Sequence, residues 1–284
     1  MNVAKLDLID HIKRFIYFYI LLAFVIILNI PVFVDLIKDW YSDSNYSHGF
    51  LVIPIAIFVI YRRRHELKFP ASPFRPGILV LLTGCIGFVF GIAASEYFTI
   101  RFSLLLIITG ISLFYLGIKN FKKVWFAFFF LLFMIPLPSV IYYSATLPMQ
   151  LFSTKATHAL LSLAGVPSLR QGNILYLPNY TLEVAEACSG LRSLVTLMAL
   201  GALYGYLTMP GTVRPLILFA ATIPIAIVTN IIRLLFTAIG AYAISPKIAE
   251  DFLHELSGLV VFVSALILLF ITGAILKWPG KHSS

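Results

Sequence analysis

Three residues in the second half of the chain carry side chains that together could perform acyl transfer. Cys188 directly precedes an apolar run, Arg233 lies within TNIIRLLF, and His254 lies in DFLHELSG just before another apolar run. A cysteine thiolate is a nucleophile, an arginine can stabilise an oxyanion, and a histidine exchanges a proton near neutrality because its ordinary pKa is about 6.5. We therefore predict attack by Cys188, charge stabilisation by Arg233 and proton transfer through His254, with a thioester intermediate.

The residues around Cys188 are suited to activating a thiol. A helix beginning at Ser189 would point free N–H groups toward the sulfur, and a nearby guanidinium would also favour the thiolate. Arg192 lies one helical turn further on, and we expect it to support the site or to bind a substrate carboxylate. Glu183 and Glu186 precede the cysteine. They are expected to orient an arginine, and the alternative is that they are solvated charges of a hairpin.

Other residues with reactive side chains are weaker candidates. His48, in YSHGF, is expected either to support the site or to begin a helix, and His158 is expected to pack at an interface. Cys85 lies inside an apolar run, which favours a packing role. A metal site is not indicated, because His254 has no second histidine at helical spacing and the chain has no cysteine pair. We expect neither a metal nor another cofactor.

The composition indicates an integral membrane protein. Hydrophobic residues make up 60% of the chain and charged residues only 12%, and the mean hydropathy is +0.97. Soluble domains carry about twice this charged fraction. The formal net charge of +9 could indicate nucleic acid, but in a membrane protein it is better explained by orientation in the bilayer. The lipid bilayer is therefore the expected environment, and nucleic acid is not an expected partner.

Eight apolar segments predict an all-α bundle of eight transmembrane helices in a single domain, residues 1–284, with no separate soluble domain. The second is short and contains Pro54. The predicted spans are Phe15–Val34, Gly49–Tyr61, Gly77–Ser95, Phe98–Gly117, Val124–Val140, Leu191–Leu207, Leu216–Phe236 and Gly258–Leu276.

Residues 141–187 are the one long stretch without a predicted span. Its first part predicts an amphipathic helix in the membrane interface, because apolar residues recur at three- and four-residue spacing from Met149 to Leu163, opposite Ser153, Thr154, Lys155 and Thr157. Its second part predicts a small hairpin outside the membrane, because Asn173–Leu177 and Thr181–Ala185 alternate around Pro178-Asn179.

The distribution of basic residues predicts the orientation of these spans. With eight spans, 14 of the 21 Lys and Arg residues fall on the side of the two termini and the other 7 on the opposite side. Since basic loops stay in the cytoplasm, both termini are expected there. Cys188, Arg233 and His254 then share the outer, periplasmic or extracellular, face of the plasma membrane.

Four motifs in order, YSHGFLVIPIAIFVIYRRR, EACSGLRSL, NIIR and H-x-x-SG, resemble the exosortase/archaeosortase family of membrane cysteine transpeptidases. The resemblance covers about the whole chain. It implies that Cys188, Arg233 and His254 are a catalytic triad. It also implies substrates that are exported, membrane-anchored proteins with a C-terminal sorting signal, made of a short motif such as Pro-Glu-Pro, a hydrophobic helix and a basic tail. Such an enzyme is a thiol protease that cleaves near the motif and can pass the acyl group to an acceptor.

Two other classes of function remain open. A transporter could use an intramembrane arginine and the prolines Pro54, Pro136 and Pro224 in a transport pathway, although no inverted repeat is visible. A noncatalytic scaffold for export of cell-envelope polymers is the second alternative. Neither should need a thiol at Cys188, so dependence on this cysteine separates the enzyme from both.

Overall fold

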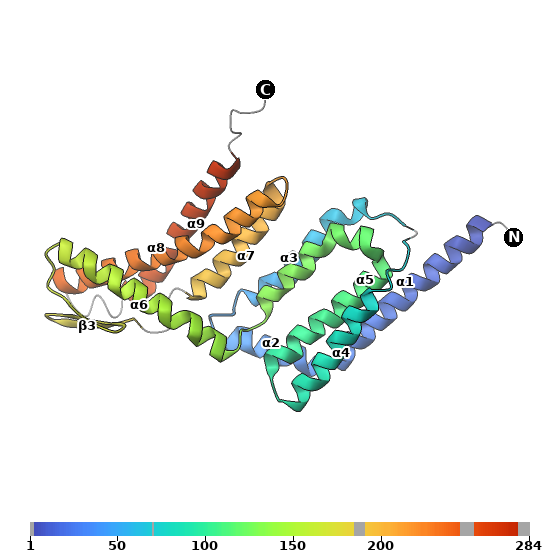
Figure 1. Ribbon diagram of the computed structural model, residues 1–284, viewed down its shortest axis with the longest axis horizontal. Coiled ribbons are helices and arrows are strands. Elements are labelled where there is room, and N and C mark those ends of the chain that lie inside the picture. The colour runs from blue at the N-terminus through green and yellow to red at the C-terminus, as the bar shows by residue number, and fades with distance from the viewer. Residues whose placement is uncertain (1–2, 70, 185–190, 245–252, 278–284) are drawn as a thin grey trace, which may run out of the picture. The chain divides into compact units, whose positions relative to one another are not determined.

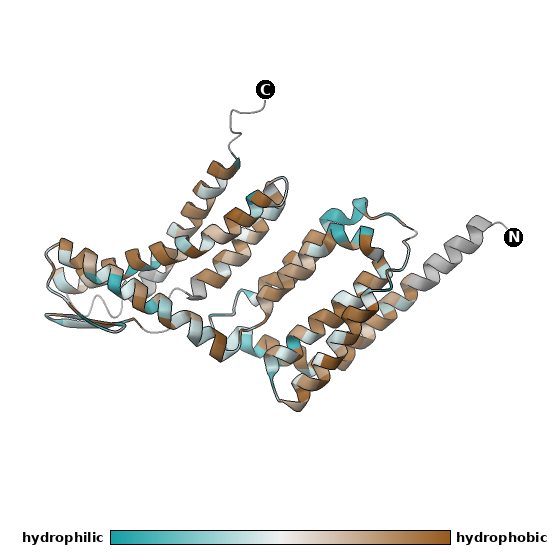
Figure 2. Ribbon diagram, in the orientation of Figure 1, coloured by the Kyte–Doolittle hydropathy of each residue, from teal (hydrophilic) through white to brown (hydrophobic). Residues whose placement is uncertain are grey.

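The computed structural model describes residues 3–69, 71–184, 191–244 and 253–277, and it is almost entirely helical (Figure 1). Contacts within the chain form two compact units, Met1–Leu137 and Pro138–Ser284. Both consist mainly of helices rich in hydrophobic residues (Figure 2), and many of their large apolar side chains are exposed. The prediction of an all-α membrane protein is confirmed.

In the described part of the chain, the helices long and apolar enough to cross a bilayer are Tyr97–Met134, Val213–Ala243 and Gly258–Lys277. A fourth crossing results if Phe15–Leu28 and Ile30–Ser42, which meet at a bend of 63°, count as one. Gly77–Ala93 and Leu194–Thr208 are shorter apolar helices. An arrangement of eight spans stays a prediction.

The first unit consists of α-helices with two short 3₁₀ segments: α1 (Val3–Leu28), α2 (Ile30–Ser42), α3 (Gly49–Arg63), η1 (Arg64–Glu66), α4 (Gly77–Ala93), α5 (Tyr97–Phe130) and η2 (Leu131–Met134). The predicted first span, Phe15–Val34, is divided between α1 and α2. Pro31 occupies the first turn of α2, where its missing N–H is tolerated, and the Asn29 side chain donates to Val25 O at 2.8 Å. The bend follows from this local chemistry, which a hydropathy count does not detect.

Close glycine contacts hold α4 against α5. Gly77, Gly84 and Gly91 are buried at seven-residue intervals on one face of α4. A Cβ at Gly84 would lie 2.8 Å from Ile107 N, so only glycine allows this approach. The turn between the helices ends at Glu96, whose carboxylate accepts hydrogen bonds from Phe98 N and Thr99 N and caps α5.

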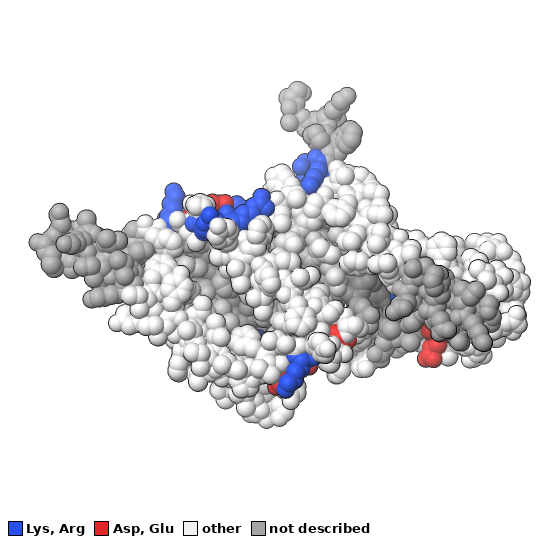
Figure 3. Space-filling model, turned by 180° about the vertical axis from the view of Figure 1, so that it is seen from behind, with Lys and Arg blue, Asp and Glu red and all other residues white. Residues whose placement is uncertain are grey.

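Helix α5 is interrupted at Gly117, which has φ 72° and ψ 159°. This is where the sequence predicts the fourth span to end. Beyond it, the Asn120 side chain exchanges two hydrogen bonds with the backbone of Lys68, and Lys123 Nζ donates to Glu66 O. These contacts hold the basic segment after α3 against the part of α5 that carries Lys119, Lys122 and Lys123. Figure 3 shows a cluster of Lys and Arg side chains on the first unit.

The second unit contains α6 (Ser139–Leu163), β1 (Leu169–Gln171), β2 (Ile174–Leu177), β3 (Tyr180–Glu183), α7 (Leu191–Thr208), α8 (Val213–Ala243) and α9 (Leu253–Lys277). The strands form an antiparallel sheet in the order β1-β2-β3, in which Leu175 pairs with both Arg170 and Leu182. Strands β2 and β3 occupy the region of the predicted hairpin. The third strand, β1, was not predicted.

The buried and exposed faces of α6 are the reverse of those predicted for it. Ser153, Thr154 and Thr157 are buried, at 1%, 0% and 0% exposure, whereas Phe152 and Leu163 are 57% and 85% exposed. The prediction of a polar outer face is therefore wrong for these three residues, although Lys155 is exposed. The reason is that lipid is an apolar solvent, in which apolar side chains can face outward and polar ones seek partners inside the protein.

The helices α7, α8 and α9 pack into a group whose directions are fixed by close contacts. Gly205 of α7 faces Pro215 of α8, and Gly201 faces Thr222, so these helices are antiparallel. Gly201 also faces Leu269 of α9, and the Tyr204 ring lies 5.1 Å from Phe270 and beside Gly273, so α7 and α9 are parallel. The starts of α7 and α9 consequently lie at the same end as the C-terminal part of α8.

Candidate active site

Arg233 lies in the C-terminal half of α8 and is partly buried. The next residue, Leu234, is 1% exposed and packs in a cluster with Leu161 of α6 and with Leu175 and Leu182 of the sheet. Thr237 Oγ1 donates to Arg233 O at 3.0 Å. The sheet and α6 thus fix the segment of α8 that carries this guanidinium.

The other two predicted catalytic residues flank elements that begin at the same end. Helix α7 begins at Leu191, three residues after Cys188, and His254 is in the first turn of α9. Continuing the antiparallel register of α7 and α8 brings the start of α7 level with the part of α8 that carries Arg233. Cys188 and Glu186 themselves lie outside the described residues, as do the side chains of Arg192 and His254.

Glu183 ends β3, where it pairs with Ile174, and its side chain is exposed. The strand is closed beyond it by two contacts between Asn173 and Val184, Val184 N to Asn173 O at 3.0 Å and Asn173 Nδ2 to Val184 O at 3.2 Å. The exposed carboxylate is compatible with a solvated charge of the sheet, and a role for Glu183 in orienting an arginine stays a prediction.

His48 belongs to the first unit, at the residue before α3. Its Nε2 lies 2.9 Å from Phe133 O, and since a carbonyl only accepts, Nε2 carries the proton. Burial lowers the pKa of His48, against the opposing effect of hydrogen bonds with the backbone of Phe133 and Asn45. Next to it, Gly49 contacts the indole of Trp40, whose Nε1 donates to Met134 O at 2.8 Å. The geometry gives His48 a role in tying the start of α3 to the end of η2, and its role in catalysis stays a prediction.

The remaining candidates behave differently from one another. His158 Nδ1 lies 2.9 Å from Ser168 Oγ and connects α6 to the chain before β1.

Cys85, predicted to be a packing residue, is instead exposed on α4, next to Ile86, which is 71% exposed. In the described residues no three His, Cys, Asp or Glu side chains are grouped as metal ligands.

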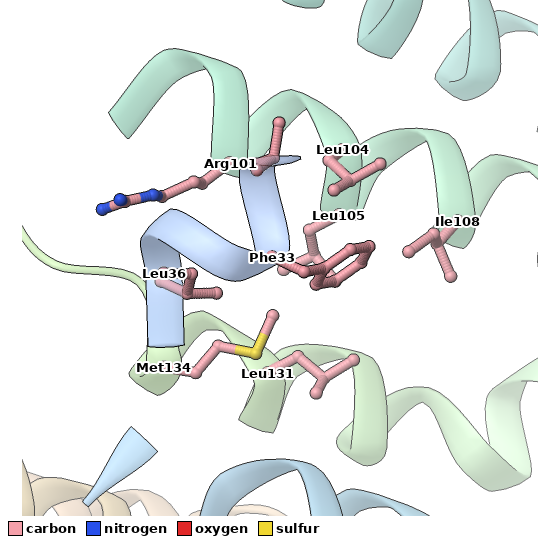
Figure 4. Close-up of a pocket in the computed structure, with 9 residues that line it drawn as sticks. Phe33, Leu36, Arg101, Leu104, Leu105, Ile108, Leu131 and Met134 are labelled. Carbon is pink, nitrogen blue, oxygen red and sulfur yellow. The ribbon is translucent and has the colours of Figure 1, made fainter. Parts of the chain in front are cut away.

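A small apolar pocket in the first unit has none of these candidates in its lining (Figure 4). It is lined by residues of α2, α5 and η2, and Arg101 is its one charged member. The guanidinium of Arg101 pairs with Asp39, so the pocket offers a ligand no nucleophile and no uncommitted charge. We assign no chemistry to it.

Two buried polar residues at the level of Arg233 are not among the candidates that the sequence analysis identified. Asn230 lies one turn before Arg233 on α8 at 1% exposure, and Thr157 lies on the buried face of α6 at 0%. A signal was present, because Gln150, Ser153, Thr154 and Thr157 recur at the spacing of one helix face. From the sequence alone, Ser153, Thr154 and Thr157, without Gln150, are predicted to lie on the polar, outward side of the helix.

Comparisons with curated proteins and with solved structures gave no match. The sequence model of the transmembrane exosortases matches residues 40–271, which include the segments of Cys188, Arg233 and His254 and also the motif around His48. This family comprises membrane proteases and transpeptidases that sort exported proteins. Since the match extends over most of both units, the chain belongs to the transmembrane exosortase family.

Proposed function

We propose that this protein is a membrane-embedded cysteine protease and transpeptidase that removes C-terminal sorting signals from exported proteins. Family membership supports the general role in membrane protein sorting. The specific proposal rests on one observation, which is that the starts of α7 and α9 lie at the same end of the helix group as the C-terminal part of α8. The start of α7 follows Cys188, the start of α9 holds His254, and the adjoining part of α8 carries Arg233.

In the proposed reaction, the Cys188 thiolate attacks the carbonyl carbon of the scissile peptide bond and forms a C–S bond. The carbonyl electron pair moves onto oxygen, and the Arg233 guanidinium stabilises this oxyanion. When the tetrahedral intermediate collapses, the C–N bond breaks and protonated His254 gives its proton to the leaving amine of the signal fragment.

A thioester between Cys188 and the exported protein remains. Neutral His254 then accepts a proton from water or from an acceptor nucleophile, which attacks the thioester carbonyl. Collapse of the second intermediate expels the Cys188 thiolate, and the enzyme returns to its starting state with His254 protonated. Water gives hydrolysis and an acceptor gives transfer, and no cofactor takes part.

The proposed substrates carry a short motif such as Pro-Glu-Pro, then a hydrophobic helix and a basic tail. The hydrophobic helix would lie beside the helices α7, α8 and α9, with the motif at the level of Arg233. We further propose that both units act as a single domain, since the family match runs through both. Both termini would be cytoplasmic and the site would face the outside of the plasma membrane, as the distribution of basic residues indicates.

Four residues are proposed to support the reaction. Arg192, in the first turn of α7, would bind a substrate carboxylate, and Glu186 would orient an arginine. Glu183, which is exposed, and His48, which contacts Phe133 O, are the remaining supporting candidates.

The test is to follow a membrane substrate with such a signal in cells that express this chain or its variants, measuring both cleavage and a trapped covalent adduct. Cys188→Ala should abolish both. Cys85→Ala is the matched control, because it removes the other thiol of the chain, which is exposed on α4, and should change neither. Unchanged processing by a stably inserted Cys188→Ala protein would refute the thiol mechanism and favour a transporter or a scaffold.

A further inference from the structure

A row of polar side chains on α6 faces the interior of the second unit. Gln150, Ser153, Thr154 and Thr157 are 6%, 1%, 0% and 0% exposed, and their spacing puts them on one side of the helix. None carries a charge. On α8, Asn230 contacts this row, and its neighbour Thr229 is also buried; both are 1% exposed.

The register of the two helices brings this row to Arg233. Asn230 Nδ2 donates to Ser153 Oγ at 3.4 Å, and Leu161, two turns after Ser153, packs in one cluster with Leu234 and Ala238. Helices α6 and α8 therefore run parallel, and Thr157 is level with the turn of α8 that carries Arg233. Arg233 is itself only partly buried.

Among these buried side chains of α6 and α8, two hydroxyls donate a hydrogen bond within their own helix, whereas two other polar atoms have no partner in the described part of the chain. Thr154 Oγ1 donates to Gln150 O at 2.6 Å, and Thr229 Oγ1 donates to Ile225 O at 2.9 Å. By contrast, Thr157 Oγ1 and Asn230 Oδ1 are buried and have no hydrogen-bond partner among the residues that the structure describes. Leaving a buried polar atom unpaired destabilises a protein, so such atoms point to a ligand.

The chemistry of these atoms selects the ligand. A hydroxyl both donates and accepts, and an amide oxygen accepts, so the pair offers no charge to an ion and no apolar surface to a lipid chain. A peptide main chain presents the complementary N–H and C=O groups. Beside a hydrophobic helix, a main chain that is unwound for cleavage loses its internal hydrogen bonds and needs such partners from the protein.

We propose that Thr157 and Asn230 bind the substrate main chain next to the scissile bond, the Asn230 carboxamide oxygen accepting from an N–H and the Thr157 hydroxyl pairing with a neighbouring peptide group. This inference rests on the proposed function, because it places the scissile carbonyl at Arg233. Both residues are then substrate-binding residues, and they hold the unwound segment within one helical turn of that guanidinium.

The first experiment measures binding without turnover, in the full-length Cys188→Ala protein in nanodiscs. The probe is a synthetic peptide with a Pro-Glu-Pro segment, a hydrophobic helix and a basic tail. Thr157→Val and Asn230→Leu should each weaken its binding by about threefold to tenfold, the loss typical of one hydrogen bond. Thr229→Val is the matched control, since its hydroxyl is already paired within α8, and it should leave the affinity unchanged.

Thermal stability separates this role from a structural one. Thr157→Val removes an unpaired hydroxyl at nearly constant volume, so the melting temperature should stay the same or rise. A lower melting temperature with unchanged peptide affinity would show that the hydroxyl has a structural partner, and would overturn the inference.

The second experiment replaces peptide N–H groups of the probe by ester oxygen, one at a time through the Pro-Glu-Pro segment and the residues that flank it. One replacement should weaken binding to the protein with Asn230 and have no further effect on the Asn230→Leu variant. The inference would be overturned if every ester replacement weakened binding by the same factor in the proteins with and without Asn230. It would also be overturned if the probe did not bind the Cys188→Ala protein. The proposed function is judged separately, by whether Cys188→Ala abolishes processing in cells.

Discussion

Arg101 Nη1 lies 2.7 Å from Asp39 Oδ2, in an ion pair that joins α5 to α2. The arginine side chain is 6% exposed and the aspartate side chain 42%. An arginine buried this deeply near the start of an apolar helix requires a partner, because an unpaired charge is costly to take out of water. With the Trp40 indole, which donates to Met134 O, the pair fixes the end of α2 in the first unit.

The asymmetry of this pair gives a first prediction. Asp39→Asn should reduce the free energy of unfolding by about 1–3 kcal/mol, less than the loss at a fully buried pair because Asp39 is partly solvated. Arg101→Met should cost less, because it removes the charge and keeps an apolar side chain of similar length. Thermal unfolding of both variants and of the double variant in one detergent provides the measurement. If both single variants lost the same free energy of unfolding, the explanation that Asp39→Asn leaves an unpaired buried charge would be wrong.

The glycine contacts of α4 give a second prediction. Gly84→Ala should destabilise the α4–α5 pair by about 1–3 kcal/mol, because the added methyl group meets the backbone at Ile107 N, which cannot rotate away. Gly87→Ala is the control on the same helix, where the new methyl group meets only the Ser103 hydroxyl. That side chain can turn aside, so Gly87→Ala should be close to neutral. The melting temperatures decide, and similar losses at both positions would refute the argument from backbone contact.

The third prediction concerns pH. The pKa of His48 is lowered in the folded protein, so the folded state binds fewer protons there than the unfolded state. Above the ordinary histidine pKa of about 6.5, His48 is neutral in both the folded and the unfolded state. As the pH drops below that value, the unfolded state binds a proton that the folded state does not, so the free energy of unfolding should fall. His48→Gln keeps a donor toward Phe133 O and should flatten this part of the pH profile.

The measurement for His48 is the difference in melting temperature between pH 7.5 and pH 5, compared in the parent and the variant. Other groups titrate in this range and affect both proteins alike, so only the change in slope counts. An identical slope in His48→Gln would show that His48 does not carry the acid sensitivity.

The fourth prediction concerns Arg233 in the proposed reaction. Arg233→Gln should slow cleavage by about 100-fold to 1,000-fold, the loss typical of one oxyanion donor. Binding of the sorting-signal peptide should change little, since the charge it stabilises develops only in the transition state. The cleavage rate of Arg233→Lys should lie between those of the parent protein and Arg233→Gln. Single-turnover rates and peptide affinities separate the effects, and a loss confined to affinity would make Arg233 a substrate-binding residue instead.

The sequence by itself determined the class of protein and its family. A composition dominated by apolar residues is a property of the whole chain and needs no tertiary contacts to be informative. The order of the motifs around His48, Cys188, Arg233 and His254 was also sufficient for the family, which the match over residues 40–271 confirms. The end of the fourth predicted span at Gly117 coincides with the interruption of α5, because such a break depends on backbone chemistry within a few residues.

The tertiary structure decided which side of each helix faces the protein. Helical periodicity shows that Ser153, Thr154 and Thr157 share a face, but the same pattern suits a helix with its polar side toward water and one with its polar side toward the interior. The contacts of α6 with the sheet and α8 bury that face, and the register of the two helices puts Thr157 level with the turn of α8 that carries Arg233. In a bilayer the apolar solvent removes the usual rule that apolar faces point inward, so only packing between distant segments could select the orientation.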